Sequence, residues 1–492
     1  MTIFRESLFP PDSNAPLYQA LYNHMRAAIL SGELTAGMKL PSTRALAEEL
    51  NISRNTVLNA YRQLLAEGYL EGKEGSGTFV AHVLPDYLLT TPRHDTHVTR
   101  SAQPPEADAF QPSFSERAKA QIAVSQPSSS GKRPRPFLAE APALDVFPYA
   151  LWSRLVVRQA RRMPQSNFMY QDSWGYRPLR EAIVAHLMVS RQVHCTPEQV
   201  MIVQGSQSAL DLAARVLVNP GDPVWLEDPG YSGARGAFLG AGANIIPVPV
   251  DREGLVVEVG VTRAPQARLV YLTPSHQFPL GVTMSIPRRL SLLDWAKRVN
   301  SYIIEDDYDS EFRFATRPLA TLQGLDDADR VIYIGTFSKV LFPSLRIGYM
   351  ILPPALVDPF LKVRRLVDIH SPVLEQAALA EFMMEGHFVR HLRRMRTLYA
   401  GRRRALVEAA RELPLEIDSA EAGIHCVGWL PDGMDDRTLA SRAVDYDLNL
   451  TPISSFGIEP LVRKGFLLGY GGYDVQEIKD GIKRLGDLLK SV

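Results

Sequence analysis

The chain has 492 residues, too many for one small core, and typical domain sizes predict roughly two to four folding units. Hydrophobic residues make up 46% of it and charged residues 22%, as in soluble globular proteins, and 54 Lys and Arg balance 54 Asp and Glu, so net charge indicates no particular partner. Two cysteines, Cys195 and Cys426, exclude a disulfide framework and a cysteine zinc site. Because no apolar stretch approaches the ~20 residues that span a bilayer, we expect a cytoplasmic protein without membrane contact.

Residues 1–80 contain three helical patterns followed by a hairpin pattern. The first helix is predicted to run from Pro16 to Ser31, and Ser42 and Ser53 stand as N-caps of the next two. The apolar positions of the third helix have the spacing of one buried face: Val57, Ala60, Tyr61, Leu64 and Leu65. The segment YLEGKEGSGTFV is typical of two short strands joined by a glycine-rich tip. This order predicts a winged helix-turn-helix.

The third helix begins with polar side chains that can reach DNA base edges and phosphates. The segment GELTAGMKLPSTRALAEELNISRNTVLNAYRQLLAEGYLEGKEGSGTFV resembles the GntR family of bacterial regulators. The resemblance implies DNA contacts by Arg44, Ser53, Arg54, Asn55, Thr56 and Gly77. The competing interpretation is a three-helix interaction module, because seven Lys and Arg face eight Asp and Glu over residues 1–80, which gives no basic footprint. We favour DNA binding, since the helix pattern and the wing agree.

Residues 81–136 lack periodic apolar segments and are rich in proline, serine and charged residues. This composition predicts an extended, flexible linker. The basic cluster KRPRP at residues 132–136 could contact DNA phosphates, but a solvated linker end is the simpler interpretation.

From residue 137 to 492, helical and strand-like segments alternate, which predicts an α/β domain. The segment VMIVQGSQSALDLAARVL indicates a strand, a glycine turn and a helix that begins near Ser206, whose free N–H groups suit a phosphate. Tyr231 follows another apolar strand, where its ring could stack on a flat cofactor or belong to the core.

The segment SYIIEDDYDSEF is a predicted strand that ends in carboxylates. One buried carboxylate opposite a heterocyclic nitrogen would keep that nitrogen protonated, and a phenol two residues later could bond a ring oxygen. A calcium or magnesium site at Glu305, Asp306, Asp307 and Asp309 is the weaker alternative, because the spacing lacks the glycine and terminal glutamate of a calcium loop. We therefore expect no metal.

The segment IGTFSKVLFPSLRIGY places Lys339 after an apolar strand and Arg346 seven residues later. A lysine at such a strand end is partly desolvated, which lowers its pKa and makes its amine a Schiff-base nucleophile. Thr336 and Ser338 add hydroxyls, and with the fixed cation of Arg346 they suit a phosphate. From this segment alone, an ordinary surface lysine is an equal alternative.

Six segments together resemble the fold-type I pyridoxal-phosphate aminotransferases over most of residues 137–492: YQDSWGYRPLREAI, GSQSALDL, EDPGYSG, TPSHQFPLG, EDDYDSEF and GTFSKVLFPSLRIGY. The resemblance implies helices on both faces of a mostly parallel sheet, a small C-terminal α+β subdomain, and pyridoxal 5'-phosphate as cofactor. It implies that Lys339 forms the Schiff base and Asp306 pairs with the pyridine nitrogen. It further implies that Tyr308 contacts the ring hydroxyl and Tyr231 stacks on the ring. The implied phosphate ligands are Ser206, Gln207, Thr336, Ser338 and Arg346.

Two segments depart from that family. Its asparagine-proline-threonine-glycine turn meets the cofactor ring oxygen, whereas this chain has HQFPLG, so we expect His276 or Gln277 to substitute. Its carboxylate-clamping arginine is replaced by leucine in FLLGY, residues 466–470, and each charge-assisted bond lost is worth about 1.5–3 kcal/mol. Arg463 lies near enough in sequence to replace it. The second departure argues against an efficient α-amino-acid transaminase.

The fusion of both parts resembles the MocR subfamily of GntR regulators, in which an aminotransferase-like domain senses a ligand through pyridoxal phosphate. We therefore predict a DNA-binding transcriptional regulator with at most residual enzymatic activity. Its effector is pyridoxal phosphate itself, acting on vitamin B6 synthesis genes, or an amine or amino acid that condenses at Lys339. The alternative is an active aminotransferase with a tethered winged helix. The resemblance also implies a homodimer, since paired DNA-binding heads need two chains.

Overall fold

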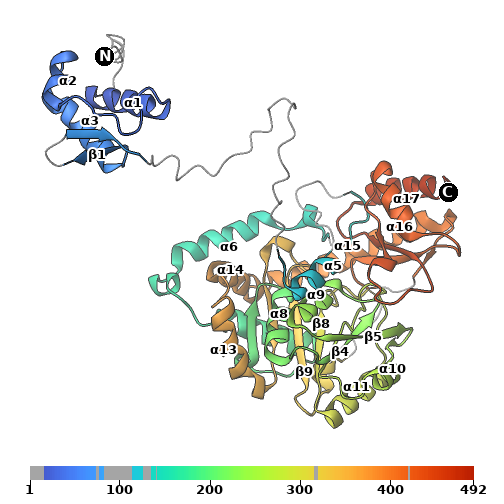
Figure 1. The fold of residues 1–492 in the computed structure, drawn as a ribbon. Coiled ribbons are helices and arrows are strands. Elements are labelled where there is room, and N and C mark those ends of the chain that lie inside the picture. Colours follow the sequence, from blue (N-terminus) through green and yellow to red (C-terminus); the bar gives the residue numbers. More distant parts are fainter. Residues whose placement is uncertain are drawn as a thin grey trace. The chain divides into compact units, whose positions relative to one another are not determined.

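The computed structural model describes residues 16–73, 77–82, 113–125, 135–139, 141–314, 320–418 and 422–491 (Figure 1). The chain divides into two compact units, Met1–Gln111 and Pro112–Val492. The tip of the predicted hairpin and most of the predicted linker, with most of the basic cluster at 132–136, lie outside the described residues.

The N-terminal unit is built from three helices and one antiparallel strand pair: α1 (Leu17–Leu30), α2 (Thr43–Glu49), α3 (Arg54–Ala66), β1 (Leu70–Lys73) and β2 (Gly77–Val80) (Figure 1). Both predicted N-caps are confirmed, because the Ser42 hydroxyl accepts from Ala45 N–H and the Ser53 hydroxyl from Thr56 N–H. The predicted inner face of α3 is buried except for Leu65, which is 38% exposed. The unit has its own core, in which α1 and α2 pack on α3.

The second unit contains one eight-stranded sheet, in the order β3-β10-β9-β8-β7-β4-β5-β6. Its strands are β3 (Val200–Val203), β4 (Pro223–Asp228), β5 (Asn244–Asp251), β6 (Gly254–Leu255), β7 (Leu269–Leu272), β8 (Tyr302–Asp307), β9 (Val331–Thr336) and β10 (Gly348–Ile351). The central neighbours β5, β4, β7, β8 and β9 run parallel, whereas β10 is antiparallel to both β9 and β3. The strands are nearly continuous apolar runs because both faces of the sheet are covered.

Helices cover both faces of this sheet, which confirms the α/β expectation (Figure 1). One face packs on α8 (Ser206–Leu217), α9 (Ser232–Ala241) and α13 (Val357–Val367). The other face packs on the remaining helices of the sheet layer: α7 (Arg177–Arg191), α10 (Val257–Arg263), α11 (Ile286–Val299), α12 (Leu322–Leu325) and α14 (Val373–Met384). Outside them, α6 (Tyr149–Arg162) packs on α14.

A smaller antiparallel sheet forms the C-terminal part of the second unit, in the order β11-β12-β14-β13. Its strands are β11 (Glu416–Ile417), β12 (His425–Trp429), β13 (Thr451–Pro452) and β14 (Gly465–Gly469), and its helices are α15 (His387–Ala409), α16 (Asp436–Arg442) and α17 (Val475–Lys490). This arrangement confirms the predicted α+β subdomain. Single-turn 3-10 helices join the elements: η2 (Leu144–Val146), η3 (Gln165–Phe168), η4 (Pro197–Gln199), η5 (Pro343–Leu345), η6 (Pro354–Leu356), η7 (Ala410–Glu412), η8 (Ala443–Tyr446) and η9 (Ile453–Ser455).

One helix, α5 (Glu116–Val124), falls within the range predicted as a flexible linker. Ser115 caps its start, and the Gln121 side chain donates to the carbonyl of Gly236 in α9 at 3.0 Å. The helix buries none of its residues, so its sequence has no apolar face that would reveal it. Across the described ranges, no helix is long and apolar enough to cross a membrane.

Candidate functional site

A cavity lies where the carboxyl ends of β7, β8 and β9 approach the start of β12. Such a strand-end position is where ligands bind in open α/β sheets. Nine of the ten predicted cofactor residues line this cavity: Ser206, Gln207, Tyr231, Asp306, Tyr308, Thr336, Ser338, Lys339 and Arg346. Topology therefore gathers side chains that are more than a hundred residues apart in the sequence.

Lys339 lies on the short connection between β9 and β10, and its side chain is half-buried in the cavity wall. The backbone before it is anchored, because Phe337 N–H donates to Ile347 O at 3.0 Å. Leu341 N–H donates to Phe337 O at 2.8 Å, which closes the turn around the lysine. The amine is thus presented to the cavity by a fixed turn.

One part of the cavity has the donors that a phosphate needs. The α8 helix begins here without a side-chain cap, after Gly205 at φ +85°, so its first N–H groups are available to a ligand. Arg346 is exposed, and its guanidinium donates to the Gln204 carbonyl at 2.8 Å. The Ser338 hydroxyl is buried without a hydrogen-bond partner. A phosphate fits this set, because it would supply the missing partner and face a fixed cation.

The Asp306 carboxylate offers a second incomplete group. It is 3% exposed, and Tyr271 O–H donates to one of its oxygens at 3.0 Å, while its other oxygen is buried without a partner. Burial raises the pKa of Asp306 to about 7, and the charges of Asp307 and Asp309 act in the same direction. A protonated pyridine nitrogen fits here, because it would bond the free oxygen and favour the ionised carboxylate.

Aromatic rings surround the space between these two groups. Tyr231 meets Phe278 edge to face at 5.9 Å, and its hydroxyl donates to Gln207 at 3.4 Å. Phe278 also meets Tyr308 edge to face at 6.0 Å. The rings line a space that suits a flat heterocycle.

His276 and Gln277 do not line the cavity, where one of them is predicted to meet the cofactor directly. His276 lies behind Tyr308, because its Nδ1 atom is held 2.9 and 3.0 Å from the Asp309 carboxylate oxygens. Gln277 is engaged by nearby backbone, because its amide donates to Phe278 O in its own turn and to Pro229 O after β4. The residue that this turn presents to the cavity is the apolar Phe278.

His425, at the start of β12, is a cavity residue that sequence reasoning missed. Its ring stacks with Tyr308 at 6.3 Å, with 7° between the planes, and it is 3% exposed. Burial, with the charge of Lys339 acting in the same direction, lowers the pKa of His425 well below its ordinary value, so the ring is neutral. A histidine inside an apolar strand gives no sequence signal that separates a cavity wall from a core.

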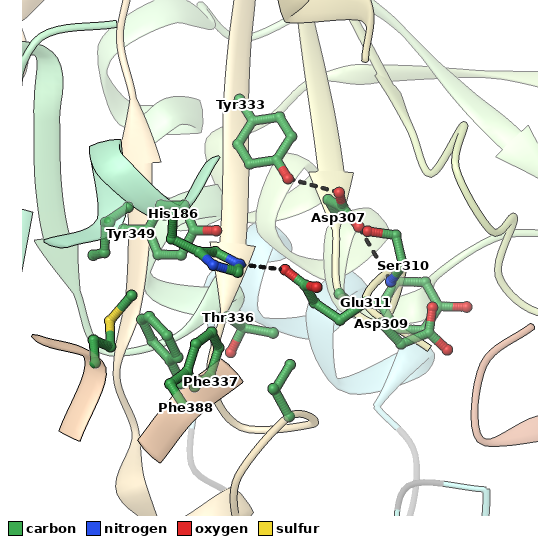
Figure 2. A pocket seen from close by; sticks show the side chains of 14 residues that line it. His186, Asp307, Asp309, Ser310, Glu311, Tyr333, Thr336, Phe337, Tyr349 and Phe388 are labelled. Atoms are coloured by element: carbon green, nitrogen blue, oxygen red, sulfur yellow. Dashed lines mark hydrogen bonds and ion pairs between the residues drawn. The ribbon is translucent and has the colours of Figure 1, made fainter. Parts of the chain in front are cut away.

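A network of ion pairs lies on the other side of β8, beside a smaller pocket (Figure 2). Asp307 pairs with Arg191 at 2.5 Å and accepts from Tyr333 O–H at 2.6 Å. Burial alone would raise the pKa of Asp307, but Arg191 outweighs it and the pKa lies below its ordinary value. Glu311, which follows on the same loop, pairs with His186 at 2.7 Å (Figure 2).

The carboxylates considered for a metal site have separate protein partners. Glu305 accepts from the backbone N–H groups of Leu322 and Gln323, on a different side from Asp306. Across the described part of the chain, no three His, Cys, Asp or Glu side chains converge as metal ligands would.

The predicted replacement for a carboxylate-clamping arginine is not in the cavity. Leu467 is 1% exposed and belongs to the hydrophobic cluster that includes Ala139 and borders Phe278, two residues of the cavity wall. Arg463 instead pairs with Glu416 at 2.5 Å and lies over the Trp429 ring at 4.7 Å. Of the described residues that line the cavity, only Lys339 and Arg346 are cationic.

The predicted DNA-contacting residues lie on α2, at the start of α3 and at the start of β2. Arg54 and Asn55 are exposed at the start of α3, while Ser53 and Thr56 bond each other at 2.8 Å as part of the cap. Arg44 is exposed on α2 and pairs with Glu48 at 3.2 Å. Gly77 begins β2 at φ +108°, a conformation that favours glycine.

Comparison with known proteins identifies both units. Residues 17–80 match the model of the gntR family of bacterial regulatory proteins, and residues 150–467 match aminotransferase class I and II. The chain is 42% identical over 477 residues to the probable rhizopine catabolism regulatory protein MocR of Rhizobium meliloti, covering 96% of this chain and 94% of the relative. It is 30% identical over 475 residues to the pyridoxine biosynthesis transcriptional regulator PdxR of Corynebacterium glutamicum, with 95% of each chain covered.

Among solved structures, the kynurenine aminotransferase of Pyrococcus horikoshii, crystallised in complex with PMP, superposes with a TM-score of 0.67 at 29% identity. The superposition covers 77% of this chain and 95% of that enzyme. The fold of the second unit is thus shared with a cofactor-binding enzyme, whereas the relatives that match nearly the whole chain are regulators.

Proposed function

The chain belongs to the gntR family of bacterial regulatory proteins, among the MocR-type regulators that carry an aminotransferase class I and II domain, and we propose that its second unit binds pyridoxal 5'-phosphate through Lys339. In this proposal residues 1–80 bind operator DNA, 81–136 connect the parts, and 137–492 sense the effector. The regulator acts in the cytoplasm, where its DNA is.

The observation that carries the cofactor proposal is the pair of unsatisfied polar atoms in the cavity. Asp306 Oδ1 and Ser338 Oγ are buried without partners, and leaving such groups unpaired costs about 1–3 kcal/mol each. A pyridinium nitrogen would satisfy the first and a phosphate the second. Bound there, the cofactor supplies an aldehyde carbon that bonds to primary amines.

The other residues have positioning roles in this proposal. Arg346 and the start of α8, with Ser206 and Gln207, hold the phosphate, joined by Thr336. Tyr231 stacks on the ring, and Tyr308 hydrogen-bonds the ring oxygen. Each of these side chains lines the same cavity.

The effector is proposed to be pyridoxal phosphate itself, acting on vitamin B6 synthesis genes, or an amine that condenses at Lys339. The name of one relative, a pyridoxine biosynthesis regulator, supports the first possibility. The packing of Leu467 against the cavity wall favours an effector without a carboxylate over an α-amino acid. The same feature disfavours an efficient aminotransferase and leaves at most residual activity.

A homodimer is the proposed assembly. Large apolar side chains are exposed before α7 and in the last turn of α13: Phe168 is 71% exposed, Met169 69%, Tyr170 82% and Leu366 88%. The two segments meet, because Tyr170 contacts His370 with ring centroids 6.2 Å apart. A contiguous apolar patch of this kind marks an interaction surface, and paired DNA heads make a second copy its expected occupant.

Reconstitution with pyridoxal phosphate tests the cofactor proposal. We expect a visible absorption band in the wild type that is absent in Lys339→Ala and retained in Lys362→Ala, a matched lysine exposed on α13. Footprinting of DNA upstream of the protein's own and neighbouring genes then tests the regulator. A protected site that changes on adding the cofactor supports it. A colourless wild type, or no protected site together with rapid transamination, would contradict it.

A further inference from the structure

We propose that His276, acting through its Nδ1–H group, turns the hydroxyl hydrogen of Tyr308 into the cofactor cavity. The inference rests on the proposed binding of pyridoxal phosphate there. It makes His276 a positioning residue, because it acts on the ligand only through Tyr308.

The first step is the tautomer of His276. Its Nδ1 atom lies 2.9 and 3.0 Å from the two oxygens of Asp309, and both side chains are at most 2% exposed. A carboxylate only accepts hydrogen bonds, so an unprotonated Nδ1 would place its lone pair against two buried oxygens. Nδ1 therefore carries a hydrogen and donates it to Asp309.

The other ring nitrogen agrees with this assignment. His276 Nε2 is buried without a hydrogen-bond partner. If it also carried a hydrogen, a buried donor would be left unsatisfied, which is the costlier arrangement. His276 is accordingly a neutral ring with its single hydrogen on Nδ1.

The second step concerns the phenol. Tyr308 Oη lies 3.1 Å from the same Nδ1 atom. Because that nitrogen carries a hydrogen and has no free lone pair, the phenol cannot donate to it, and the hydroxyl hydrogen must point elsewhere. Tyr308 lines the cavity, where a cofactor ring oxygen would be the acceptor.

The arrangement is held rigidly by close packing. Gly423 has φ +75°, and an ideal Cβ there would lie 2.3 Å from His276 Cε1 and 2.6 Å from Asp309 Oδ2. No larger residue fits without moving the His276–Asp309 pair. On the other side, the neutral His425 ring stacks on Tyr308.

The surrounding groups keep the phenol a donor. Burial, and then the charges of Asp309, Asp306 and Glu227, raise the pKa of Tyr308 well above its ordinary value. Asp307 on β8 acts in the same direction. The remaining titratable groups of the cavity wall are Tyr231, Tyr271, Lys339, Arg346 and His425. The Tyr308 hydroxyl thus stays protonated across the pH range in which proteins are studied.

The test is a pH titration of the visible band of the full chain loaded with pyridoxal phosphate. A hydrogen bond to the ring oxygen is worth most once the Lys339 nitrogen has lost its proton, so the donor lowers the midpoint of the spectral change. We expect Tyr308→Phe to raise the midpoint by roughly one pH unit, and His276→Leu to raise it in the same direction. His276→Asn places an amide N–H where Nδ1 was and should stay close to the wild type.

A double variant shows whether His276 acts through Tyr308. In a Tyr308→Phe background, His276→Leu should add no further shift. A wild-type midpoint in His276→Leu, or equal shifts in both backgrounds, would overturn the inference while the band itself leaves the cofactor proposal intact. A colourless wild type would instead contradict the cofactor proposal.

A measurement on the wild type covers the case in which His276→Leu does not fold. In protein labelled with nitrogen-15 at histidine, the His276 signals, identified by their loss in His276→Asn, should show a protonated Nδ1 and an unprotonated Nε2. The opposite tautomer would overturn the inference.

Discussion

Asp306 and Asp307 are neighbours on β8, yet they face opposite sides of the strand and have opposite electrostatics. Asp307 is fully engaged by Arg191, Tyr333 and the Ser310 backbone, and its pKa is lowered. Asp306 retains a buried oxygen without a partner, and its pKa is raised to about 7. The comparison teaches that a buried carboxylate with both oxygens engaged by the protein marks structure, whereas one with an unpartnered oxygen marks a place for a ligand.

The largest effect should come from breaking the buried ion pair between Arg191 and Asp307. Arg191→Met leaves the Asp307 charge buried without its ion-pair partner, which costs about 3–5 kcal/mol of unfolding free energy. Urea denaturation followed by tryptophan fluorescence reports on this unit, because all five tryptophans of the chain lie in it. Arg298→Met, which removes an exposed pair with Asp294, is the matched control and should change little. Equal unfolding free energies of Arg191→Met and Arg298→Met would contradict a structural role for the Arg191–Asp307 pair.

The stability contribution of Asp306 should depend on pH in the opposite direction to that of Asp307, because the two pKa values are shifted in opposite directions. Its pKa is raised in the folded state, so its stabilising contribution is present below its ordinary pKa near 3.8 and is lost as pH rises through about 7. Without cofactor, the wild type should therefore lose stability relative to Asp306→Asn between about pH 4 and 7, by an amount on the order of a few kcal/mol. Urea denaturation at pH 5 and 8 measures the difference. A gap between the two proteins that does not vary with pH would contradict the raised pKa.

Cofactor affinity should separate the two aspartates most directly. Asp306→Asn keeps the shape but removes the charge facing the pyridine nitrogen, so pyridoxal phosphate should bind roughly ten- to hundredfold more weakly. Asp307→Asn should lower stability and leave affinity much less affected, since Asp307 faces away from the cavity. Titration of the visible band with cofactor measures both. A larger affinity loss in Asp307→Asn would reverse the assignment.

The distinction between side chains engaged within the protein and side chains left for a ligand also applies to the N-terminal unit, with a smaller expected effect. Arg54 is exposed at the start of α3, and Arg54→Ala should weaken specific DNA binding by about 1–3 kcal/mol if it bonds a base edge. Fluorescence anisotropy with the footprinted operator provides the measurement, and Arg298→Ala in the second unit is the control. Unchanged affinity would reject a base-reading role for Arg54.

Much of the cavity was predictable from sequence, because its motifs lie at strand ends and helix starts. In a parallel sheet these positions converge at one edge, so Lys339, Asp306, Tyr308 and the start of α8 had to meet. The winged unit was predictable for a related reason. Its caps at Ser42 and Ser53 and the apolar spacing of α3 are local features.

The remainder depends on contacts between residues distant in sequence. His276 was expected to face the cofactor, but Asp309, 33 residues away, holds it behind Tyr308. Tyr271, Phe278 and His425 were missed as cavity residues because they lie in or beside apolar segments, where core and cavity residues have the same pattern. Packing alone decides whether a side chain of such a segment points to the core or to the cavity.

The most direct test of the central claim is operator binding measured with and without pyridoxal phosphate, in the wild type and in Lys339→Ala. If Lys339 is the sensing residue, the cofactor must favour one arrangement of the protein over another, so it should change wild-type operator affinity several-fold or more. Lys339→Ala should bind the operator with the same affinity in both conditions. An equal response of the two proteins to the cofactor would contradict the claim.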